Sequence, residues 1–462
     1  MKLFHLILFA SLHFGLSGCS KKNGEDIPYP TDSIGRIDRW IADSLRRYYY
    51  WSDAIPGKPD YTKSPDNFFT SLLSSSDRFS WVSNGLDIAP PSNSYFLYGF
   101  HYALVQASGY DGLIGVVTDI NKGGAADGAG FKRGSYFMAV NGEKVTTQNM
   151  EAVNLLLRTP SSVRITRAAY TDSGWKPAAE TALYEGYAYE DPVRYTRTFT
   201  AGGIATGYLY YTSFDENYDD RLLQAFDEFR QAGVKELILD LRYNAGGSVA
   251  SSAKLAALIA NRLSASETFA IYAGNRFEGK RGRLLQEVVN TSGNAAGRTY
   301  DELKKHQLSL SRVFILTTGA TVSAAELIVN NLKPFLQVVQ IGETTRGKNE
   351  AGFVIQDTRN PPQVEWKMEP TVYKLFNKNG EGNYEKGLIP QYLTAEMALL
   401  PLADIGTSDD PLVNKALSLI YGRGIPPDFT TLRSKQTSIK IIPVYRSAEE
   451  GVQFSLMHIK KS

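Results

Sequence analysis

The spacing of apolar residues predicts a helical N-terminal part. In IGRIDRWIADSLRRYYYW (34–51), Ile37, Trp40, Ile41 and Leu45 recur at intervals of three and four residues, so they form one apolar stripe on a helix. A second short helix is predicted around residues 68–73. We interpret residues 34–85 as a small helical module that supports packing and carries no catalytic residue.

Between residues 95 and 170 the pattern changes to short strands and glycine turns. The run LIGVVTDI (113–120) predicts a buried strand, and YFMAVNGEKV (136–145) predicts two strands joined by an Asn141-Gly142 turn. A helix over residues 150–158 and a closing strand complete this segment. The segment is therefore predicted to be a small β-rich domain.

Strands alternate with helices from about residue 190 to residue 420. The runs KELILDLRYNAGG (235–247), RVFILTTGA (312–320) and LQVVQIG (336–342) are apolar, and helical patterns separate them. This alternation predicts parallel βαβ units with functional groups at the carboxyl ends of the strands. The predicted fold class is an α/β core joined to the β-rich domain and the helical module, and residues 421–462 form a tail without an assigned role.

The beginning of the chain has the features of an export signal. Lys2 precedes an apolar stretch that ends in LSGC at Cys19. This ending resembles the bacterial lipobox, which implies that residues 1–19 are a lipoprotein signal peptide, that Cys19 is lipidated and that residues 20–33 form a tether. The implied location is the bacterial cell envelope, facing the periplasm or the surface, with a membrane as partner. The alternative is an ordinary signal peptide in which Cys19 occurs by chance.

Composition narrows the classes of function. The formal net charge of +2 gives no basic footprint, so nucleic acid is not an expected partner. Cys19 is the only cysteine, which excludes disulfides and cysteine-based metal sites. We expect neither a metal nor a cofactor. No later segment reaches the roughly 18 consecutive apolar residues of a spanning helix, and the oligomeric state stays open.

Ser323 is the candidate nucleophile. In TTGATVSAAELIVNNLKP (317–334) a cluster of small residues runs into a helical pattern, so Ser323 is either a nucleophile or an N-cap. A serine hydroxyl needs a base to accept its proton. The histidines of the chain are His5, His13, His101, His306 and His458. None of them is well placed, and a Ser-His-Asp triad remains an alternative.

Lys348 is the preferred base. It follows the run 336–342 and a short polar loop, so one helix and one returning strand separate it from Ser323. A βαβ unit returns the chain to the sheet edge from which it started, where both residues can meet. Burial lowers a lysine pKa and can leave the amine neutral near pH 7. The alternative is a solvated surface lysine.

Gly246 and Gly247 are candidates for an oxyanion hole. They directly follow a buried strand, and a backbone without Cβ can approach a substrate closely. The amide of Ala324, at the start of the predicted helix, is the candidate second donor. The alternative is an ordinary glycine turn between a strand and a helix.

These segments together resemble the C-terminal processing peptidases, which are serine peptidases of family S41. Ser323 is followed by a small residue and, three places on, by Glu326, and GETTRGK places Lys348 25 residues after Ser323. DLRYNAGG is similar to the family's D-L-R-x-N-x-G-G, and GLIPQY near residue 387 is similar to its G-x-x-P element. The resemblance covers residues 200–420 and implies a crotonase/ClpP-like core with a Ser-Lys dyad.

The chain departs from the family pattern at one position. Many members carry a glutamine four residues after the lysine, where this chain has Gly352. Glu350 and Gln356 are the candidate substitutes that would support the dyad. The departure also leaves open a catalytically impaired relative that only binds peptides.

The β-rich segment resembles a PDZ domain, although Ser135-Tyr136 stands where such domains usually have Gly-Asp. The matching positions are Ala126, Gly130, Gly134, Val140, Asn141 and Gly142. The resemblance implies that a peptide adds as a strand to a sheet edge and faces the helix near Val153 and Leu157. The implied carboxylate loop contains Gly99, Phe100 and His101.

The predicted function is a lipid-anchored serine endopeptidase that cleaves polypeptides. Neutral Lys348 would take the proton of Ser323 as Oγ attacks the scissile carbonyl, and amides near the glycine pair and Ala324 would hold the oxyanion. One alternative is the peptide-binding relative. The other is a crotonase-like acyl-CoA enzyme, whose fold also combines glycine-rich oxyanion loops with βαβ units.

Overall fold

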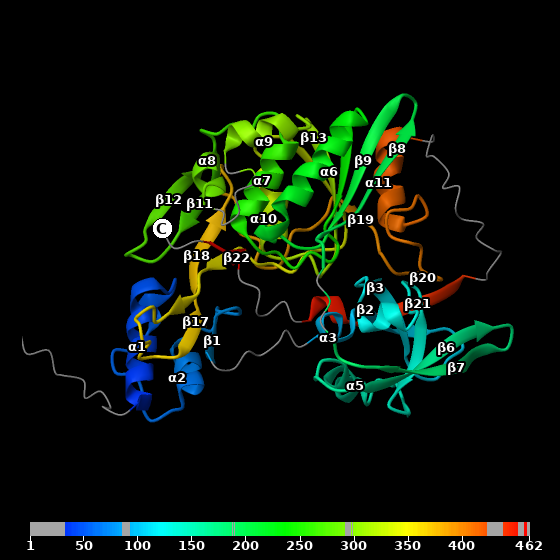
Figure 1. The fold of residues 1–462 in the computed structure, drawn as a ribbon, viewed down its shortest axis with the longest axis horizontal. Helices are drawn as coiled ribbons and strands as arrows, with labels where there is room; N and C mark the ends of the chain where they lie inside the picture. Colours follow the sequence, from blue (N-terminus) through cyan, green and yellow to red (C-terminus); the bar gives the residue numbers. More distant parts are fainter. Residues whose placement is uncertain are drawn as a thin grey trace, which may run out of the picture.

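The computed structural model describes residues 33–85, 93–186, 188, 190–291, 297, 299–422, 438–450 and 457–459. Figure 1 shows a large central α/β part with two smaller lobes on one side of it, one blue (N-terminal) and one cyan to teal. The predicted signal peptide, Cys19 and all of the tether except Ser33 lie outside the described residues. Among the helices that are described, none is long and apolar enough to cross a membrane.

A six-stranded sheet forms the centre, in the order β19-β14-β13-β10-β9-β8. Its strands are β8 (Val193–Ala201), β9 (Ile204–Tyr211), β10 (Glu236–Asp240), β13 (Arg312–Thr317), β14 (Gln337–Gly342) and β19 (Tyr392–Leu393). Strands β9, β10, β13, β14 and β19 are parallel, and only β8 runs antiparallel to its neighbour. The prediction of parallel βαβ units is therefore confirmed.

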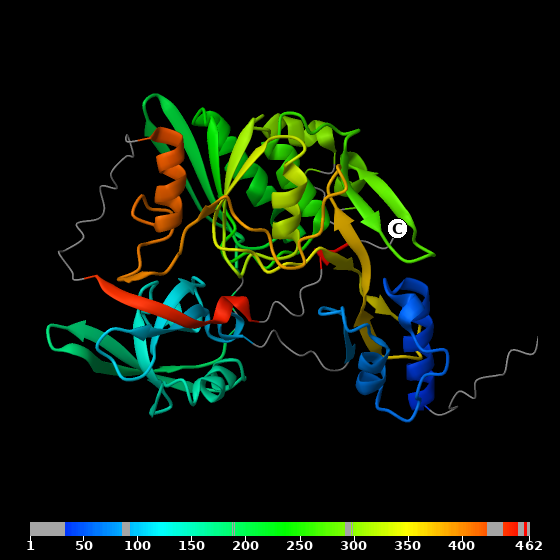
Figure 2. The ribbon, with the colours of Figure 1, turned by 180° about the vertical axis from the view of Figure 1, so that it is seen from behind.

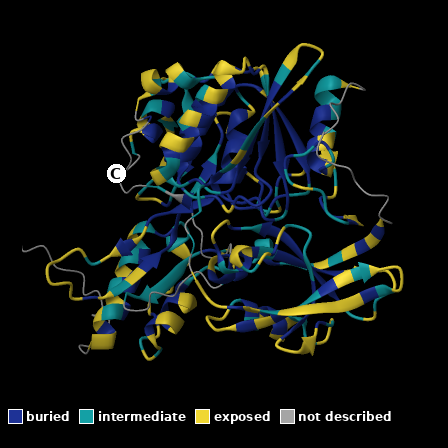
Figure 3. Cartoon of the chain, turned by 45° about the vertical axis from the view of Figure 1, so that its right-hand side comes forward, coloured by how far each residue is buried: buried dark blue, intermediate teal, exposed yellow. Residues whose placement is uncertain are grey.

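Helices cover both faces of the central sheet, which explains why its strands are apolar runs without alternation. Successive side chains of β10 point to opposite faces: Leu237 and Leu239 join one hydrophobic cluster and Ile238 joins another. The helices of this part are α6 (Asp219–Gln231), α7 (Val249–Ile259), α8 (Leu285–Val289), α9 (Tyr300–His306), α10 (Ala324–Leu332) and α11 (Pro411–Tyr421), with the 3₁₀ turn η2 (Glu216–Tyr218). Residues of α7 and α10 belong to the first cluster and residues of α11 to the second. Figure 3 shows the resulting buried strands in dark blue.

The N-terminal lobe does not have a separate core. It contains α1 (Ser33–Tyr48), the 3₁₀ turn η1 (Ser52–Ala54), α2 (Pro65–Leu72) and β1 (Trp81–Asn84). Ile41 and Leu45 of α1 belong to the same hydrophobic cluster as the central sheet. Strand β1 also pairs with β17 (Trp366–Glu369), which in turn pairs with β16 (Ile355–Gln356). Residues 34–85 are thus packed into the core as one body with it.

A five-stranded sheet lies beside the central part, in the order β12-β11-β18-β15-β22. Its strands are β11 (Thr268–Ala273), β12 (Lys280–Leu284), β15 (Glu350–Gly352), β18 (Thr371–Phe376) and β22 (Met457–His458). The last of these comes from the C-terminal tail, where His458 pairs with Gly352.

The β-rich lobe contains the elements predicted between residues 95 and 170 and extends to residue 183. They are α3 (Ser94–Tyr98), β2 (Phe100–Ala107), β3 (Ile114–Ile120), α4 (Ala125–Gly128), β4 (Tyr136–Val140), β5 (Glu143–Lys144), α5 (Met150–Leu157), β6 (Val163–Thr171) and β7 (Gly174–Leu183). Asn141 and Gly142 have φ of 51° and 84°, as a two-residue hairpin turn requires, so the predicted hairpin is confirmed.

The sheet of this lobe also takes up chain from the far end of the sequence. Its order is β20-β21-β2-β3-β4-β6-β7, with β5 paired to β4. The added elements are β20 (Leu399–Leu400) and β21 (Ile439–Arg446), followed by the 3₁₀ turn η3 (Ser447–Glu449). Figure 2 shows β21 in red along the cyan strands. The tail therefore has a structural place that its sequence pattern did not reveal.

Candidate active site

Ser323 occupies the N-cap position of α10, directly after the connection that follows β13. Its φ of 64° and ψ of −121° are rare for a residue with a Cβ, and such backbone strain costs about 1–3 kcal/mol. Its side chain is fully buried and does not cap the helix. Among the described residues, Oγ has no hydrogen-bond partner. A strained strand-to-helix turn with an unengaged hydroxyl is compatible with the predicted role of Ser323 as a nucleophile.

Gly246 lies against Ser323. A Cβ added to Gly246 would be 2.6 Å from Cβ and 3.0 Å from Oγ of Ser323, so only glycine fits. The φ values of 93° at Gly246 and 129° at Gly247 also favour glycine. The amide of Gly246 already donates to Oδ1 of Asn244, at 2.8 Å. The predicted close approach of this loop to the nucleophile is present, with the Gly246 amide engaged inside the loop.

The carboxylate of Glu326 joins two loops. The serine loop, residues 318–323, connects β13 to α10, and the lysine loop, residues 343–349, connects β14 to β15. Glu326 Oε2 accepts hydrogen bonds from the amides of Ser323 and Lys348, at 3.0 and 2.8 Å. Its Oε1 accepts from the amide of Gly347 at 2.7 Å and from the hydroxyl of Thr345. Burial raises the pKa of Glu326 to about 7, although these hydrogen bonds oppose the rise. The two backbone amides thus lie within about two hydrogen-bond lengths of each other.

Lys348 is fully buried, as the prediction of a neutral base requires. Burial lowers its pKa to about 7, against the opposing effect of the carboxylates of Glu369, Glu350 and Glu326. The ammonium nitrogen Nζ lies 4.3 Å from the ring centroid of Phe79. No hydrogen bond reaches Ser323 Oγ from any described residue, Lys348 included, so the two side chains are neighbours through Glu326 and not directly bonded in this structure.

The N-terminal lobe contributes to the surroundings of Lys348, which the sequence did not indicate. The guanidinium of Arg78 donates to the carbonyl oxygen of Gly347, and Phe79 supplies the ring beside Nζ. The predicted role of this lobe as packing support alone is therefore too narrow.

The candidate substitutes for the missing glutamine differ in position. Gly352 is buried in β15, where its backbone pairs with β18 and β22. Glu350 is buried, and burial raises its pKa. Gln356 is exposed on β16, paired with Lys367.

Glu369, which the sequence analysis did not single out, lies at the end of β17. It is fully buried, and its Oε2 accepts a hydrogen bond from Trp81 Nε1 at 3.2 Å. Among the neighbouring charges, that of Glu369 has the largest effect on the pKa of Lys348, which it raises. Nothing in the apolar pattern around residue 369 marks it, because the strand pairing that buries it joins segments 288 residues apart.

The two histidines whose side chains are described are engaged elsewhere. His101 is buried and stacks on Tyr95, with ring centroids 4.2 Å apart, and burial lowers its pKa to about 3. His306 Nδ1 lies 2.8 Å from a carboxylate oxygen of Asp227. Neither arrangement provides a base for Ser323, and the side chain of His458 lies outside the described part.

The residues of the implied carboxylate loop lie at the start of the β-rich lobe. Gly99 is the C-cap of α3, with its amide donating to the carbonyl oxygens of Ser94 and Tyr95. Phe100 and His101 are the first residues of β2, paired with Ile120 and Asp119 of β3.

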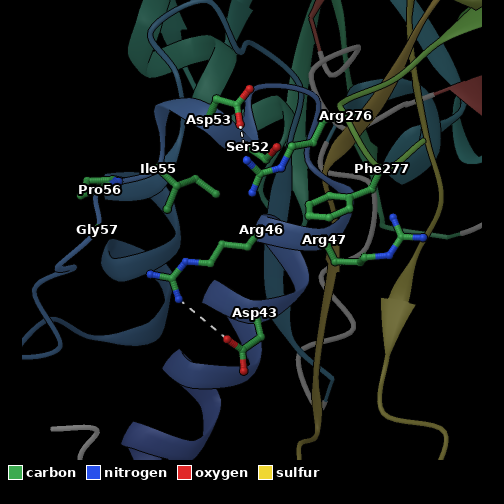
Figure 4. Close-up of a pocket in the computed structure, with 10 residues that line it drawn as sticks. All are labelled: Asp43, Arg46, Arg47, Ser52, Asp53, Ile55, Pro56, Gly57, Arg276 and Phe277. Carbon is green, nitrogen blue, oxygen red and sulfur yellow. Dashed lines mark ion pairs between the residues drawn. The ribbon is translucent and has the colours of Figure 1, made fainter. Parts of the chain in front are cut away.

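Two cavities lie outside the serine site. One, with a volume of about 520 Å³, is lined by residues of α1, η1 and the β11–β12 connection, among them Arg46, Arg47 and Arg276 (Figure 4). Their guanidinium groups pair with Asp43, Glu278 and Asp53, respectively. The other, of about 400 Å³, is lined by Arg158, Arg346, Val444, Tyr445, Arg446, Glu449 and Glu450. Only the second cavity borders the lysine loop, through Arg346.

Comparison with known proteins shows which family this chain matches. Residues 205–394 match the model of peptidase family S41, and residues 36–81 match that of the peptidase S41 N-terminal domain. A crystal structure from Bacteroides fragilis NCTC 9343 that carries an S41 protease assignment is 26% identical, with a TM-score of 0.66, and covers 83% of this chain and 97% of its own.

Curated relatives agree with this result. The carboxy-terminal processing protease CtpA of Bacillus subtilis (strain 168) is 28% identical over 65% of this chain and 57% of its own length. The carboxyl-terminal-processing protease of Synechocystis sp. (strain ATCC 27184 / PCC 6803 / Kazusa) is 23% identical over 65% of this chain and 63% of its own. The match thus spans less than two thirds of either relative. From the paired S41 models and these relatives, we conclude that the chain belongs to peptidase family S41.

Proposed function

We propose that this chain is a lipid-anchored serine endopeptidase of the C-terminal processing type, with Ser323 as nucleophile and Lys348 as base. The observation that carries the proposal is the convergence of the Ser323 and Lys348 amides on one carboxylate oxygen of Glu326. This links a strained serine to a buried lysine with a pKa near neutrality. Both properties are typical of an activated serine.

The reaction would proceed in two stages. Neutral Lys348 accepts the proton of Ser323 as Oγ attacks the scissile carbonyl, and it then gives the proton to the leaving amine. Water hydrolyses the resulting acyl-enzyme with the same base. Amides near Gly246, Gly247 and Ala324 stabilise the oxyanion, and since Gly246 is bonded to Asn244, the other two are the readier donors.

The first step needs a small rearrangement. Oγ has no partner among the described residues, so Nζ must come within about 2.6–3.2 Å of it when substrate binds. Both side chains are fully buried, so the polypeptide must also open a path to them.

The remaining parts of the proposal concern docking and location. The β-rich lobe acts as a PDZ-like domain that takes an extended peptide on a sheet edge, with Gly99, Phe100 and His101 near the peptide terminus.

Cys19 carries the lipid that holds the enzyme at a membrane of the cell envelope. Replacing Cys19 by alanine should release the chain from the membrane fraction into the soluble fraction.

The Ser323→Ala variant tests the function. It should lose cleavage of an unstructured polypeptide and labelling by a fluorophosphonate, because no other hydroxyl replaces Oγ. The matched control is Ser311→Ala, which alters an exposed serine directly before β13, the strand that leads to Ser323. This variant should behave as the wild type. Peptide binding without turnover, and no labelling of the wild-type chain, would instead favour the catalytically impaired relative.

Glu369 provides a separate prediction about pH. Its negative charge favours the protonated form of Lys348 and so raises the pKa of Lys348. Glu369→Gln removes this charge, so the pKa of Lys348 should fall. Since the base acts when neutral, the rising limb of kcat/KM against pH should move to lower pH. The control is Glu365→Gln, an exposed residue beside the same strand, which should leave the limb in place. An unchanged or alkaline-shifted limb in Glu369→Gln contradicts this role.

A further inference from the structure

Residues 438–450, named here the C-terminal strap, lie along the edge of β2 that does not pair with β3. Strand β21 pairs antiparallel with β2, with Ala103 facing Arg446 and Gln106 facing Ile442. After the strand ends, the hydroxyl of Ser447 accepts a hydrogen bond from the amide of Tyr102, at 2.8 Å. The strap therefore satisfies the edge groups of β2 as an added peptide strand would.

The strap also engages the side chains around this edge. The ring of Tyr445 packs against the hydrophobic cluster of the lobe, with its centroid 5.5 Å from that of Tyr102. Its hydroxyl donates to Glu450 at 2.7 Å, and Glu450 pairs with Arg158, just after α5, at 3.3 Å. The strap thus lies over β2 and reaches the end of α5, the helix that the peptide groove is predicted to face.

The far end of the strap reaches the loops that hold Ser323 and Lys348. Arg446 pairs with Glu343, five residues before Lys348, and with Glu449 at 3.1 Å. A Cβ added to Gly319, four residues before Ser323, would be 2.7 Å from the carboxylate of Glu449. Strap residues and Arg346 line one cavity. A polypeptide that passed from β2 to Ser323 would meet this segment.

We propose that the C-terminal strap is a built-in competitor, which occupies the β2 edge where a polypeptide substrate docks and keeps the enzyme in a low-activity state until substrate displaces it. The low-activity state rests on the proposed function, whereas the pairing of the strap with β2 does not. The strap also indicates which polypeptides would replace it. By analogy with Tyr445 and Arg446, they are extended segments with an aromatic residue above Tyr102, followed by a basic residue that faces Glu343. A segment of the same chain competes at an effective concentration of about millimolar, so free peptides bind weakly while it is in place.

Arg446→Glu tests the proposal by placing a third carboxylate beside Glu343 and Glu449. The matched control is Lys440→Glu, which makes the same charge change at an exposed position of the same strand. The probe is a fluorescein-labelled peptide with the sequence of Ser438–Ser447, and its binding is measured by anisotropy. We expect Arg446→Glu to bind it at least about tenfold more tightly than the wild type and Lys440→Glu. Equal affinity in all three chains overturns the proposal.

A reversible lock provides the second variant. In a Cys19→Ala background, cysteines at Gln106 and Ile442 face each other across the two strands, both exposed, at the separation typical of directly opposed pairs. Oxidation should abolish peptide binding and reduce polypeptide cleavage at least about tenfold, with recovery on reduction. The control pair, Arg164→Cys with Ala182→Cys in the β6–β7 hairpin, should show no redox dependence.

The two readouts separate this proposal from the proposed function. Cleavage that is the same in the oxidised and reduced lock overturns the strap's role. Redox-dependent peptide binding in a chain that cleaves nothing supports the strap as occupant of the β2 edge and contradicts the proposed endopeptidase activity.

Discussion

Lys348→Met should reduce kcat/KM for polypeptide cleavage by roughly 10²–10⁴-fold, the usual contribution of a general base. Methionine keeps the unbranched shape in a fully buried site but cannot accept the proton of Ser323. Because methionine also fills the space beside the ring of Phe79, the variant should remain folded. The loss should therefore appear in kcat with an unchanged circular dichroism spectrum.

Lys386→Met is the control for this substitution. Lys386 is exposed and belongs to the segment that follows β18, so the same chemical change there should leave the rate within about twofold. Retention of wild-type cleavage by Lys348→Met would remove Lys348 from the mechanism and reopen the search for the base.

Gly246→Ala should have the second-largest effect, with cleavage reduced by at least about 100-fold. The new Cβ would lie 2.6 Å from Cβ of Ser323 and 3.0 Å from the amide nitrogen of Ala324. One methyl group would therefore displace the nucleophile and a candidate oxyanion donor together. The measurement is kcat/KM, with thermal unfolding to record the accompanying loss of stability.

Gly174→Ala separates the effect of crowding from the effect of backbone conformation. Gly174 has a φ of 88°, close to the 93° of Gly246, but a Cβ there meets nothing within 4 Å. It should show the cost of a positive φ, about 1 kcal/mol, and no loss of activity. If Gly246→Ala is no less active than Gly174→Ala, Gly246 is not part of the site.

The parts of the site that the sequence predicted are those set by short stretches of chain. Ser323 lies at a helix start because a run of small residues precedes a helical pattern. Gly246 and Lys348 reach the same sheet edge because parallel strands connected through helices return there. In each case the apolar period and the position of a glycine or polar residue at a strand end were sufficient.

The parts that were missed depend on contacts between distant segments. Phe79 and Glu369 meet Lys348 only because β1 pairs with β17. The strap bonds Tyr102 to Ser447 across 345 residues. Strand β21 has eight residues, but its pattern does not specify which of several open sheet edges it will join. Burial of Lys348 is expected from its place after a buried strand, but the groups around it, such as Phe79, come from distant segments.

The burial of Ser323 and of Lys348 follows from the same packing. Glu326 holds the two loops together through their amides, and no hydrogen bond from a described residue reaches Ser323 Oγ. The strap lies against the same loops. In the mechanism that we propose, displacement of the strap by substrate frees both loops to move and lets Lys348 reach Ser323.

The most direct test of the account is the pH dependence of kcat/KM for cleavage of an unstructured polypeptide. Cleavage requires both docking of the substrate and transfer of the Ser323 proton to Lys348, so its pH dependence reports the base in the assembled site. The account predicts a kcat/KM that rises with pH through an apparent pKa near 7 in the wild type, and a low value without this rise in Lys348→Met. A midpoint near lysine's ordinary value of about 10.4, or equal kcat/KM for the wild type and Lys348→Met, would contradict it.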